Sequence, residues 1–436
     1  MSVAPGSLLK GTAINLLSRL AAVALVLLIT VFTARLGTEA QGAFALFTSV
    51  EGVLLALFSG FGVALAREVS HHRQAPRELL SAMLIACVAL GMLAAVALLG
   101  VALWGPAAYR SLWLLALAAP LLLIAPNIAG WWLGEGRMAP MAAVSLMPPA
   151  LTLLGILLCW GLGLASVLTV LAAWVVAKVL VGLGALLAMQ RAGRLAAPDF
   201  VALRGVMPFV ATIGLTNLIG LLNYRAGLFV IERVLGLSAT GVYSIAVVVA
   251  ELLWFVSGSL TQAVYGRIGT PDAARAAATT VRAVQLSLVA LLAVAPPLVA
   301  LAVWIIPLAL GPAYQASLPP LLVLLPGVLV FGAASALSAY FTNHAGQPGV
   351  AAQVAGLSLL LNAGLALLLV PRLGTVGAAL AASLAYSASV ALLGWRFARH
   401  AGLPWWALWL PGPQLGSDLR ALASSLLGAL RSLHRR

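Results

Sequence analysis

The sequence predicts an all-α polytopic membrane protein with about twelve transmembrane helices in two six-helix lobes. The chain of 436 residues is 63% hydrophobic and 8% charged, with a mean hydropathy of +1.11, which is too little polar surface for a protein dissolved in water. One short pattern also occurs twice, at Leu36–Phe44 and Leu235–Tyr243, and each copy opens a long apolar segment. The chain is therefore expected to be a duplicated bundle whose lobes are related by a pseudo-two-fold repeat.

Twelve apolar runs have the length that a helix needs to cross about 30 Å of hydrocarbon. They cover residues 12–34, 42–66, 79–104, 111–133, 141–163, 165–189, 205–230, 239–263, 283–306, 318–342, 350–371 and 374–398. The first run is longer than the apolar core of a signal peptide, contains Arg19 and is followed at once by a second span. It is therefore predicted to be a retained helix.

The cations between the spans predict the topology. If the N-terminus is cytoplasmic, most of them fall in the even-numbered loops and the two tails. The odd-numbered loops then hold only Arg35, Arg110, Arg225, Arg233 and Arg372. Because cytoplasmic loops are the ones enriched in Lys and Arg, both termini are predicted to be cytoplasmic. The net charge of +14 is spread over these short loops, so no nucleic-acid partner is expected.

The polarity of the loops predicts the domain organisation. Residues 191–204 form the most polar connection and are predicted to be a cytoplasmic linker between the N-terminal lobe, 1–190, and the C-terminal lobe, 205–400. Residues 401–436 are predicted to be a cytoplasmic tail. Its tryptophans suit an anchor at the headgroup level, and its leucines share one face of a helix that Ser417 can cap. An interfacial amphipathic helix is expected there, with a partner-binding helix as the alternative.

Four ionisable residues lie well inside the predicted spans: Arg19, Glu51, Lys178 and Glu251. Each opposes insertion by ~2.5 to 3.5 kcal/mol at a helix centre, so each must face protein or water. One interpretation is two structural ion pairs, for example Glu51 with Arg19 and Glu251 with Lys178. The other is a solvated cavity in which Glu51 and Glu251 exchange protons and serve as ion-coupling residues.

Polar side chains also follow one face of two predicted spans. Thr12, Asn15 and Arg19 form a stripe in the first span that can hold an anion, because a guanidinium makes bidentate contacts to phosphate. The seventh span carries further polar residues and ends beside Arg225, where contacts to neighbouring helices and snorkelling are the alternative. The candidate substrate-binding residues are Arg19, Asn15, Lys178, Asn217, Asn223 and Arg225.

The sequence contains no motif of an enzyme. It has no Gly-rich phosphate loop with Lys, no His and Cys spacing for zinc, and no Ser, His and Asp set. No enzyme activity, cofactor or metal is expected. A repeated membrane unit with internal carboxylates is typical of a transporter whose substrate site lies between the repeats. Its work would then come from an ion gradient, the membrane potential or the substrate gradient.

Three groups of motifs carry a family resemblance. They are Leu9–Gly11 through Asn15 with Ala34–Gly37 and Gln41–Phe44, then Gly241–Ala246 with Ala250–Trp254, and last Asn362 with Val370–Ala381. These stretches resemble the polysaccharide biosynthesis proteins, the lipid-linked oligosaccharide flippases of the multidrug, oligosaccharidyl-lipid and polysaccharide exporter superfamily. The resemblance runs over about residues 8–400, and its last motif is the most specific.

The resemblance implies two six-helix lobes around a central cavity that opens alternately to the cytoplasm and the outside. It implies a multi-pass protein of the bacterial inner membrane that flips polyprenyl-diphosphate-linked oligosaccharide to the outer leaflet for exopolysaccharide or O-antigen assembly. Membrane lipids are then partners, and polysaccharide polymerases or glycosyltransferases are candidate partners. Cationic residues of the first helices line the cavity in such flippases, which fits Arg19. Relatives often have an acidic residue soon after Tyr-Arg in the seventh helix, whereas Asn223–Gly227 has none, so Glu251 or Glu51 would have to replace it.

Two other functions stay open from the sequence. An ion-coupled multidrug or cation antiporter of the same superfamily should favour acidic over basic cavity residues. A membrane scaffold for polysaccharide synthesis enzymes would make the C-terminal amphipathic helix the main functional element.

Overall fold

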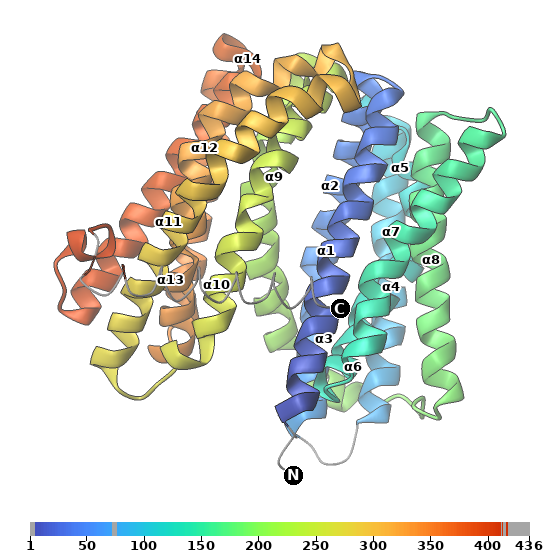
Figure 1. Cartoon of the computed structure of the whole chain (residues 1–436). Coiled ribbons are helices and arrows are strands. Elements are labelled where there is room, and N and C mark those ends of the chain that lie inside the picture. The colour runs from blue at the N-terminus through green and yellow to red at the C-terminus, as the bar shows by residue number, and fades with distance from the viewer. Residues whose placement is uncertain (1–4, 72–75, 411, 413–415, 417–436) are drawn as a thin grey trace, which may run out of the picture. The chain divides into compact units, whose positions relative to one another are not determined.

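The computed structural model describes residues 5–71, 76–410, 412 and 416, and all regular elements in this part of the chain are helical (Figure 1). The α-helices are α1 (Pro5–Arg35), α2 (Thr38–Phe58), α3 (Gly60–His71), α4 (Arg77–Trp104), α5 (Leu112–Leu122), α6 (Ile124–Gly134), α7 (Met138–Gly161), α8 (Val167–Arg191), α9 (Phe200–Glu251), α10 (Leu253–Ile268), α11 (Ala273–Ile305), α12 (Leu318–Ala333), α13 (Ser335–Ala339) and α14 (Pro348–Ala401). Short 3-10 or π turns are η1 (Ala107–Tyr109), η2 (Ile306–Leu310), η3 (Pro312–Ser317), η4 (Tyr340–His344) and η5 (Trp405–Leu408). The predicted all-α fold class is confirmed.

Ten helical stretches of the described chain are long and apolar enough to cross a membrane. Two of them, Phe200–Ile268 and Gly349–Ala401, hold 69 and 53 residues, whereas one crossing needs about 20. Each is interrupted by a glycine with positive φ, Gly236 at 82° and Gly374 at 62°, a backbone region that only glycine enters readily. The protein is a multi-pass membrane protein. Twelve crossings require each long stretch to cross twice, and this count and the cytoplasmic termini stay predictions.

Helix breaks divide four of the predicted spans, those at 42–66, 111–133, 239–263 and 318–342. The span predicted at 111–133 is divided into α5 and α6 at Leu123. Pro126 has no backbone N–H to donate to the Leu122 carbonyl, which explains why α5 ends there. The span predicted at 42–66 is divided at Ser59, whose hydroxyl donates to the Ala56 carbonyl oxygen at 2.7 Å. The sequence pattern did not show this second break.

The described chain forms two compact units. Unit 1 comprises Met1–Arg225, Leu235–Val242 and Ala309–Gly311, and unit 2 comprises Ala226–Val234, Tyr243–Leu308 and Pro312–Arg436. The lobe boundary predicted at residues 191–204 stays a prediction.

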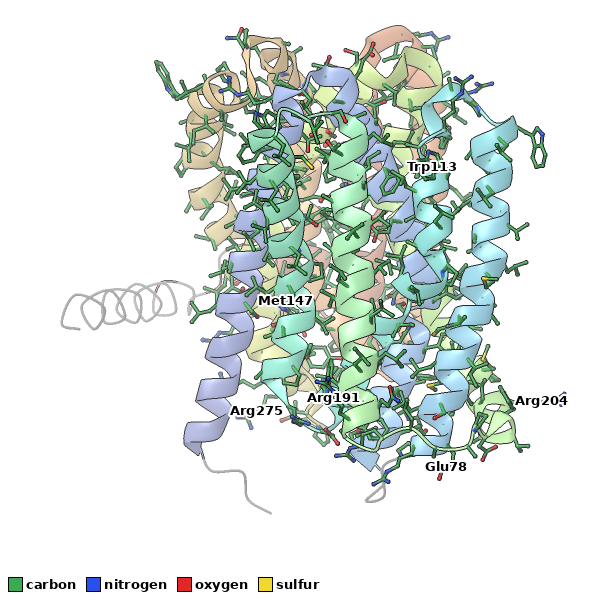
Figure 2. The ribbon with its side chains drawn as sticks, turned by 90° about the vertical axis from the view of Figure 1, so that its right-hand side faces the viewer. Glu78, Trp113, Met147, Arg191, Arg204 and Arg275 are labelled. Atoms are coloured by element: carbon green, nitrogen blue, oxygen red, sulfur yellow. The ribbon has the colours of Figure 1, made fainter. Side chains whose placement is uncertain are left out.

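Unit 1 is a bundle in which α1 packs on α7, α3 on α6, α4 on α5 and α7 on α8. Small residues allow the closest approaches: a Cβ at Gly130 would lie 2.0 Å from the Gly62 carbonyl oxygen, and one at Gly60 would lie 2.1 Å from that of Val210. Such contacts are the usual way in which membrane helices associate. The charged residues Glu78, Arg191 and Arg204 lie at one end of the unit and Trp113 lies toward the other, as Figure 2 shows.

Unit 2 is organised around α14, which packs on α12, while α10 and α12 both pack on α11. At the α12–α14 contact, the Gly327 N–H donates to the Ser383 hydroxyl at 2.9 Å, and a Cβ at Gly327 would lie 2.4 Å from the Ser383 Cα. After α14 the chain forms η5, which carries the tryptophans predicted to lie at the headgroup level. The amphipathic helix predicted from Ser417 lies outside the described residues.

Candidate functional site

The candidate site in unit 1 is an ion pair between α2 and α8. Glu51 on α2 is 2% exposed, and its carboxylate accepts a hydrogen bond from Lys178 Nζ on α8. The other carboxylate oxygen accepts from Trp174 Nε1 at 2.7 Å. Trp174 and Lys178 are four residues apart on α8, so their side chains share one face of the helix. Both carboxylate oxygens are therefore satisfied by one face of a neighbouring helix.

Aromatic rings lie beside this ion pair. Lys178 Nζ lies 4.4 Å from the centroid of the Trp174 ring, within the range of a cation–π interaction. Phe44, two turns before Glu51 on α2, packs edge-on against Trp174 with ring centroids 5.3 Å apart. The Lys178 side chain remains 21% exposed. Since an ammonium has three donors, Lys178 can hold Glu51 and still reach a second anion.

The observed pairing differs from the ion pairs considered from the sequence. Those interpretations joined Glu51 to Arg19 and Glu251 to Lys178, whereas Glu51 is paired with Lys178. The reason is the packing of α2 on α8, which brings the second and sixth predicted spans together. Sequence periodicity gives the face of each helix but not which helices are neighbours. Glu51 thus pairs with Lys178 and not with Arg19, and the suggested Glu251–Lys178 pair stays a prediction.

The remaining candidates of unit 1 lie in different surroundings. Arg19 is exposed on α1, and Asn15 lies on the same helix, but its side chain is outside the described part of the chain. Asn217 on α9 is exposed, and its Nδ2 donates to the Ser59 hydroxyl at 2.8 Å. Asn223 is 1% exposed and Arg225 is half-buried. Among the candidates, Glu51 and Lys178 are in direct contact.

Two residues escaped the sequence analysis. Trp174 was not singled out, although its position one turn before Lys178 on the same face was readable from the sequence. Glu232 is 7% exposed and lies inside α9, in unit 2. The predicted span ended at residue 230, which placed this glutamate in a loop, whereas the helix continues to the interruption at Gly236. Glu251 is half-buried at the end of α9.

The two copies of the repeated pattern contact each other within unit 1. The hydroxyl oxygens of Thr38 and Ser238 are 2.7 Å apart. A Cβ at Gly42 would lie 1.9 Å from the Leu237 carbonyl oxygen, and one at Gly241 would lie 2.0 Å from that of Thr38. We call this symmetric pairing of 38–42 with 237–241 the motif contact. Gly42 and Gly241 are required because any side chain there would meet the backbone of the other copy.

Comparisons with known proteins identify the fold. No family model matches the sequence, and no curated protein matches it. A multidrug resistance MATE family transporter of the MOP superfamily, in an inward-facing conformation, is similar with a TM-score of 0.68 at 17% identity, over 89% of this chain and 94% of that one. The lipid II flippase MurJ in an inward closed conformation gives 0.67 at 14%, over 92% and 89%. The MATE multidrug transporter DinF-BH in complex with R6G gives 0.68 at 16%, over 94% and 98%.

At these identities the similarity establishes the fold, which is that of the MOP superfamily transporters. It covers nearly the full length of each chain, so the fold is matched as a whole and not in a fragment. A lipid flippase and multidrug transporters are matched about equally well, so the fold does not choose between their substrates.

Proposed function

We propose that the protein is a flippase of the bacterial inner membrane, which moves polyprenyl-diphosphate-linked oligosaccharide from the cytoplasmic to the outer leaflet by alternating access. The observation that carries this proposal is Lys178, a partly exposed ammonium within a membrane span and against the Trp174 ring. A cation in the hydrocarbon region is costly and usually functional. Its attraction to a diphosphate is also much stronger there than in water, because the effective dielectric constant is lower.

In this mechanism the diphosphate competes with Glu51 for Lys178. The Lys178 ammonium contacts the Glu51 carboxylate in the structure. A diphosphate that reaches Lys178 weakens this pair, and Glu51 is then able to take up a proton, which couples substrate binding to an ion gradient. Arg19 is exposed on α1 and is proposed to contact phosphate. Asn15, Asn217, Asn223 and Arg225 are proposed to contact the phosphate or the sugars, and Glu251 is proposed as a second coupling residue.

The experiment that tests the proposal is transbilayer movement of a fluorescent polyprenyl-diphosphate oligosaccharide in reconstituted liposomes. Lys178→Gln, Glu51→Gln and the double variant are compared with wild type. The double variant removes both charges and keeps the side-chain size, so it leaves no buried unpaired charge. We expect it to fold but to flip at least about tenfold more slowly, the equivalent of ~1.4 kcal/mol.

One control and one further variant make this result specific. Arg204→Gln removes an exposed arginine of unit 1 outside the ion pair and should flip at the wild-type rate. Arg19→Gln should slow movement without affecting the Glu51–Lys178 pair. Wild-type movement in the double variant would show that the pair only joins two helices, and the proposal would fail.

A second candidate function is a multidrug or cation antiporter. It is favoured by the similarity to the DinF-BH transporter in complex with R6G and by three carboxylates of α2 and α9: Glu51 and Glu232 are buried, and Glu251 is half-buried. In the same vesicles a cationic dye would then be exported under a proton gradient, and Glu51→Gln would abolish its export. Dye movement without lipid movement would decide for the antiporter.

A further inference from the structure

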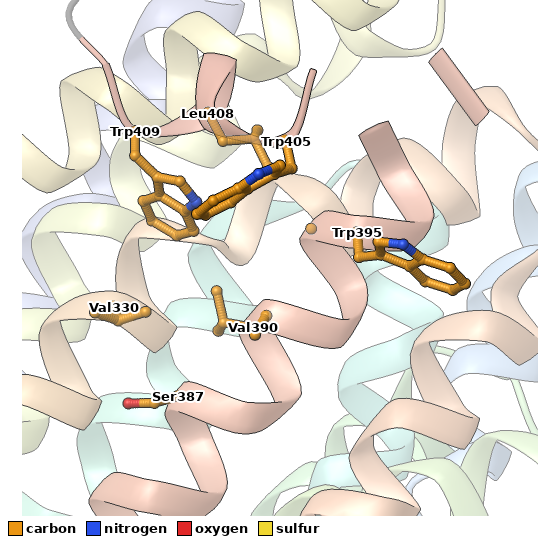
Figure 3. A pocket seen from close by; sticks show the side chains of 9 residues that line it. Val330, Ser387, Val390, Trp395, Trp405, Leu408 and Trp409 are labelled. Atoms are coloured by element: carbon orange, nitrogen blue, oxygen red, sulfur yellow. The ribbon is translucent and has the colours of Figure 1, made fainter. Parts of the chain in front are cut away.

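Unit 2 contains an apolar groove between α12, the second half of α14 and η5. Its volume is about 470 Å³, and Figure 3 shows the side chains that line it. Val330 contributes from α12, and η5 and the residue after it contribute Trp405, Leu408 and Trp409. The remaining lining residues are on α14: Ser387, Val390, Ala391, Gly394 and Trp395. We infer that this groove binds one acyl chain of an anionic phospholipid, whose headgroup lies against Arg396 and Arg399.

The groove is a built structure, because a buried side chain holds its η5 wall. Gln285 on α11 is 6% exposed, and its Nε2 donates to the carbonyl oxygens of Ala407 at 2.9 Å and Leu410 at 2.7 Å. Its Oε1 accepts from the Gly412 N–H at 3.4 Å. A buried amide in a membrane helix is costly unless its hydrogen bonds are satisfied, and here the backbone of 407–412 satisfies them. Trp405 and Trp409 are thus fixed on one side of the groove.

The lining suits a hydrocarbon chain. Ser387 is the only lining residue with a hydroxyl, and this hydroxyl donates within its own helix to the Ser383 carbonyl oxygen at 2.8 Å. The groove therefore offers no free hydroxyl to a sugar, and three of its nine lining residues are tryptophan. Trp395 and Trp405 remain 50% and 61% exposed. Tryptophan at this exposure is typical of the headgroup level of a bilayer.

The charges at the end of α14 define the headgroup. The Arg399 guanidinium carbon lies 5.0 Å from the Trp395 ring centroid, so a cation stands beside a side chain that lines the groove. One helical turn away, Arg396 Nη1 donates to Gln353 Oε1 at 3.2 Å, which orients a second guanidinium. Guanidinium groups bind phosphate in a bidentate way. An anionic headgroup therefore complements this rim, whereas a zwitterionic lipid gains less.

The positive charges of residues 417–436 argue against this segment as the occupant of the groove. Residues 417–436 begin close in sequence to the groove, and the predicted amphipathic helix carries Arg420, Arg431, Arg435 and Arg436. Docking these cations beside Arg396 and Arg399 would place like charges together. The rim therefore favours an anionic lipid over the tail.

The test is lipid retention by the full-length protein, measured by native mass spectrometry after purification from vesicles of phosphatidylglycerol and phosphatidylcholine. We expect phosphatidylglycerol to be retained in preference. Arg399→Gln should reduce this retention about fivefold, the effect of one interfacial cation. Ala391→Trp fills the groove from an exposed position and should reduce it by tenfold or more, because it displaces several methylene groups.

Arg204→Gln is the matched control, since it removes an exposed arginine of unit 1, and it should retain the lipid as wild type does. Equal retention in Ala391→Trp and wild type would assign the lipid to the general annulus and overturn the inference. Retention that rises severalfold when residues 417–436 are deleted would also overturn it, because the tail would then be the occupant. The readout is lipid binding, so either result is independent of the flippase proposal.

Discussion

The contact between the second and sixth predicted spans differs in chemistry from the contact between their counterparts, the eighth and twelfth. In unit 1 the second predicted span meets the sixth where Glu51 contacts Trp174 and Lys178. In unit 2 the corresponding spans of the second repeat meet at Trp254 and Tyr386, with ring centroids 6.3 Å apart. Phe331 on α12 completes this aromatic cluster at 5.8 Å from Trp254 and 5.0 Å from Tyr386. Trp254 Nε1 donates to a neutral acceptor, the Val328 carbonyl oxygen, at 3.3 Å.

The two contacts differ in the charge of the group that accepts the tryptophan hydrogen bond. Both contacts contain a tryptophan, but Trp174 donates to a carboxylate with a lysine beside it, whereas Trp254 donates to a backbone carbonyl of α12. The aromatic cluster gains from burial and ring geometry alone and needs no charge. The ion pair gains little net stability over an apolar contact, so its presence is better explained by a role in binding.

The largest effect is expected at the motif contact, where the two copies of the repeated pattern meet within unit 1. Thr38→Cys with Ser238→Cys replaces hydroxyls whose oxygens are 2.7 Å apart. Because alternating access requires contacts at the predicted outer side to open, oxidation to a disulfide should abolish transport, and reduction should restore it. The measurement is transbilayer movement in liposomes before and after a reducing agent.

Each single cysteine variant serves as a control for this cross-link, since both share Cys87 and Cys159 with wild type. They should respond to neither treatment. Full transport by the oxidised double variant would mean that the motif contact stays closed throughout the cycle.

The second effect is the stability cost of breaking the ion pair from one side. Lys178→Gln leaves the Glu51 carboxylate buried without its cation, and we expect a loss of about 3 kcal/mol in the free energy of unfolding. The double variant Glu51→Gln/Lys178→Gln should recover most of this loss. Thermal unfolding in detergent or nanodiscs measures both, and equal losses in the single and double variants would contradict the assignment.

The sequence predicted the fold class and the charged residues, but not how they pair. Hydropathy and length were enough for an all-α membrane protein, because each span must satisfy its own backbone. The glutamates and Lys178 were visible because charges within apolar runs are rare. Their partners depend on which helices are neighbours, and the packing of α2 on α8 is a long-range contact without a local signal. Glu232 was missed for a different reason. The hydropathy pattern ended the predicted span at residue 230, whereas the helix continues to Gly236.

A smaller effect is expected when the charged acceptor in unit 1 loses only its tryptophan donor. Trp174→Phe keeps a ring beside Lys178 and removes the bond from Nε1 to Glu51 Oε2. Hydrogen bonds to charged groups contribute about 1.5 to 3 kcal/mol, so we expect a loss of about 2 kcal/mol in the free energy of unfolding. A variant as stable as wild type would show that this bond does not stabilise the carboxylate.

The smallest effect is expected from the same substitution in unit 2. Trp254→Phe removes a bond to a neutral carbonyl oxygen at 3.3 Å and keeps a ring against Phe331 and Tyr386. A neutral bond contributes about 1 kcal/mol, and this long one should contribute less than the bond in unit 1. Thermal unfolding of both tryptophan variants under the same conditions tests the order, and transport by Trp254→Phe should match wild type. If Trp254→Phe cost more than Trp174→Phe, the charge on the acceptor would not be what distinguishes the two repeats, and the aromatic cluster of unit 2 would become the better candidate for a functional site.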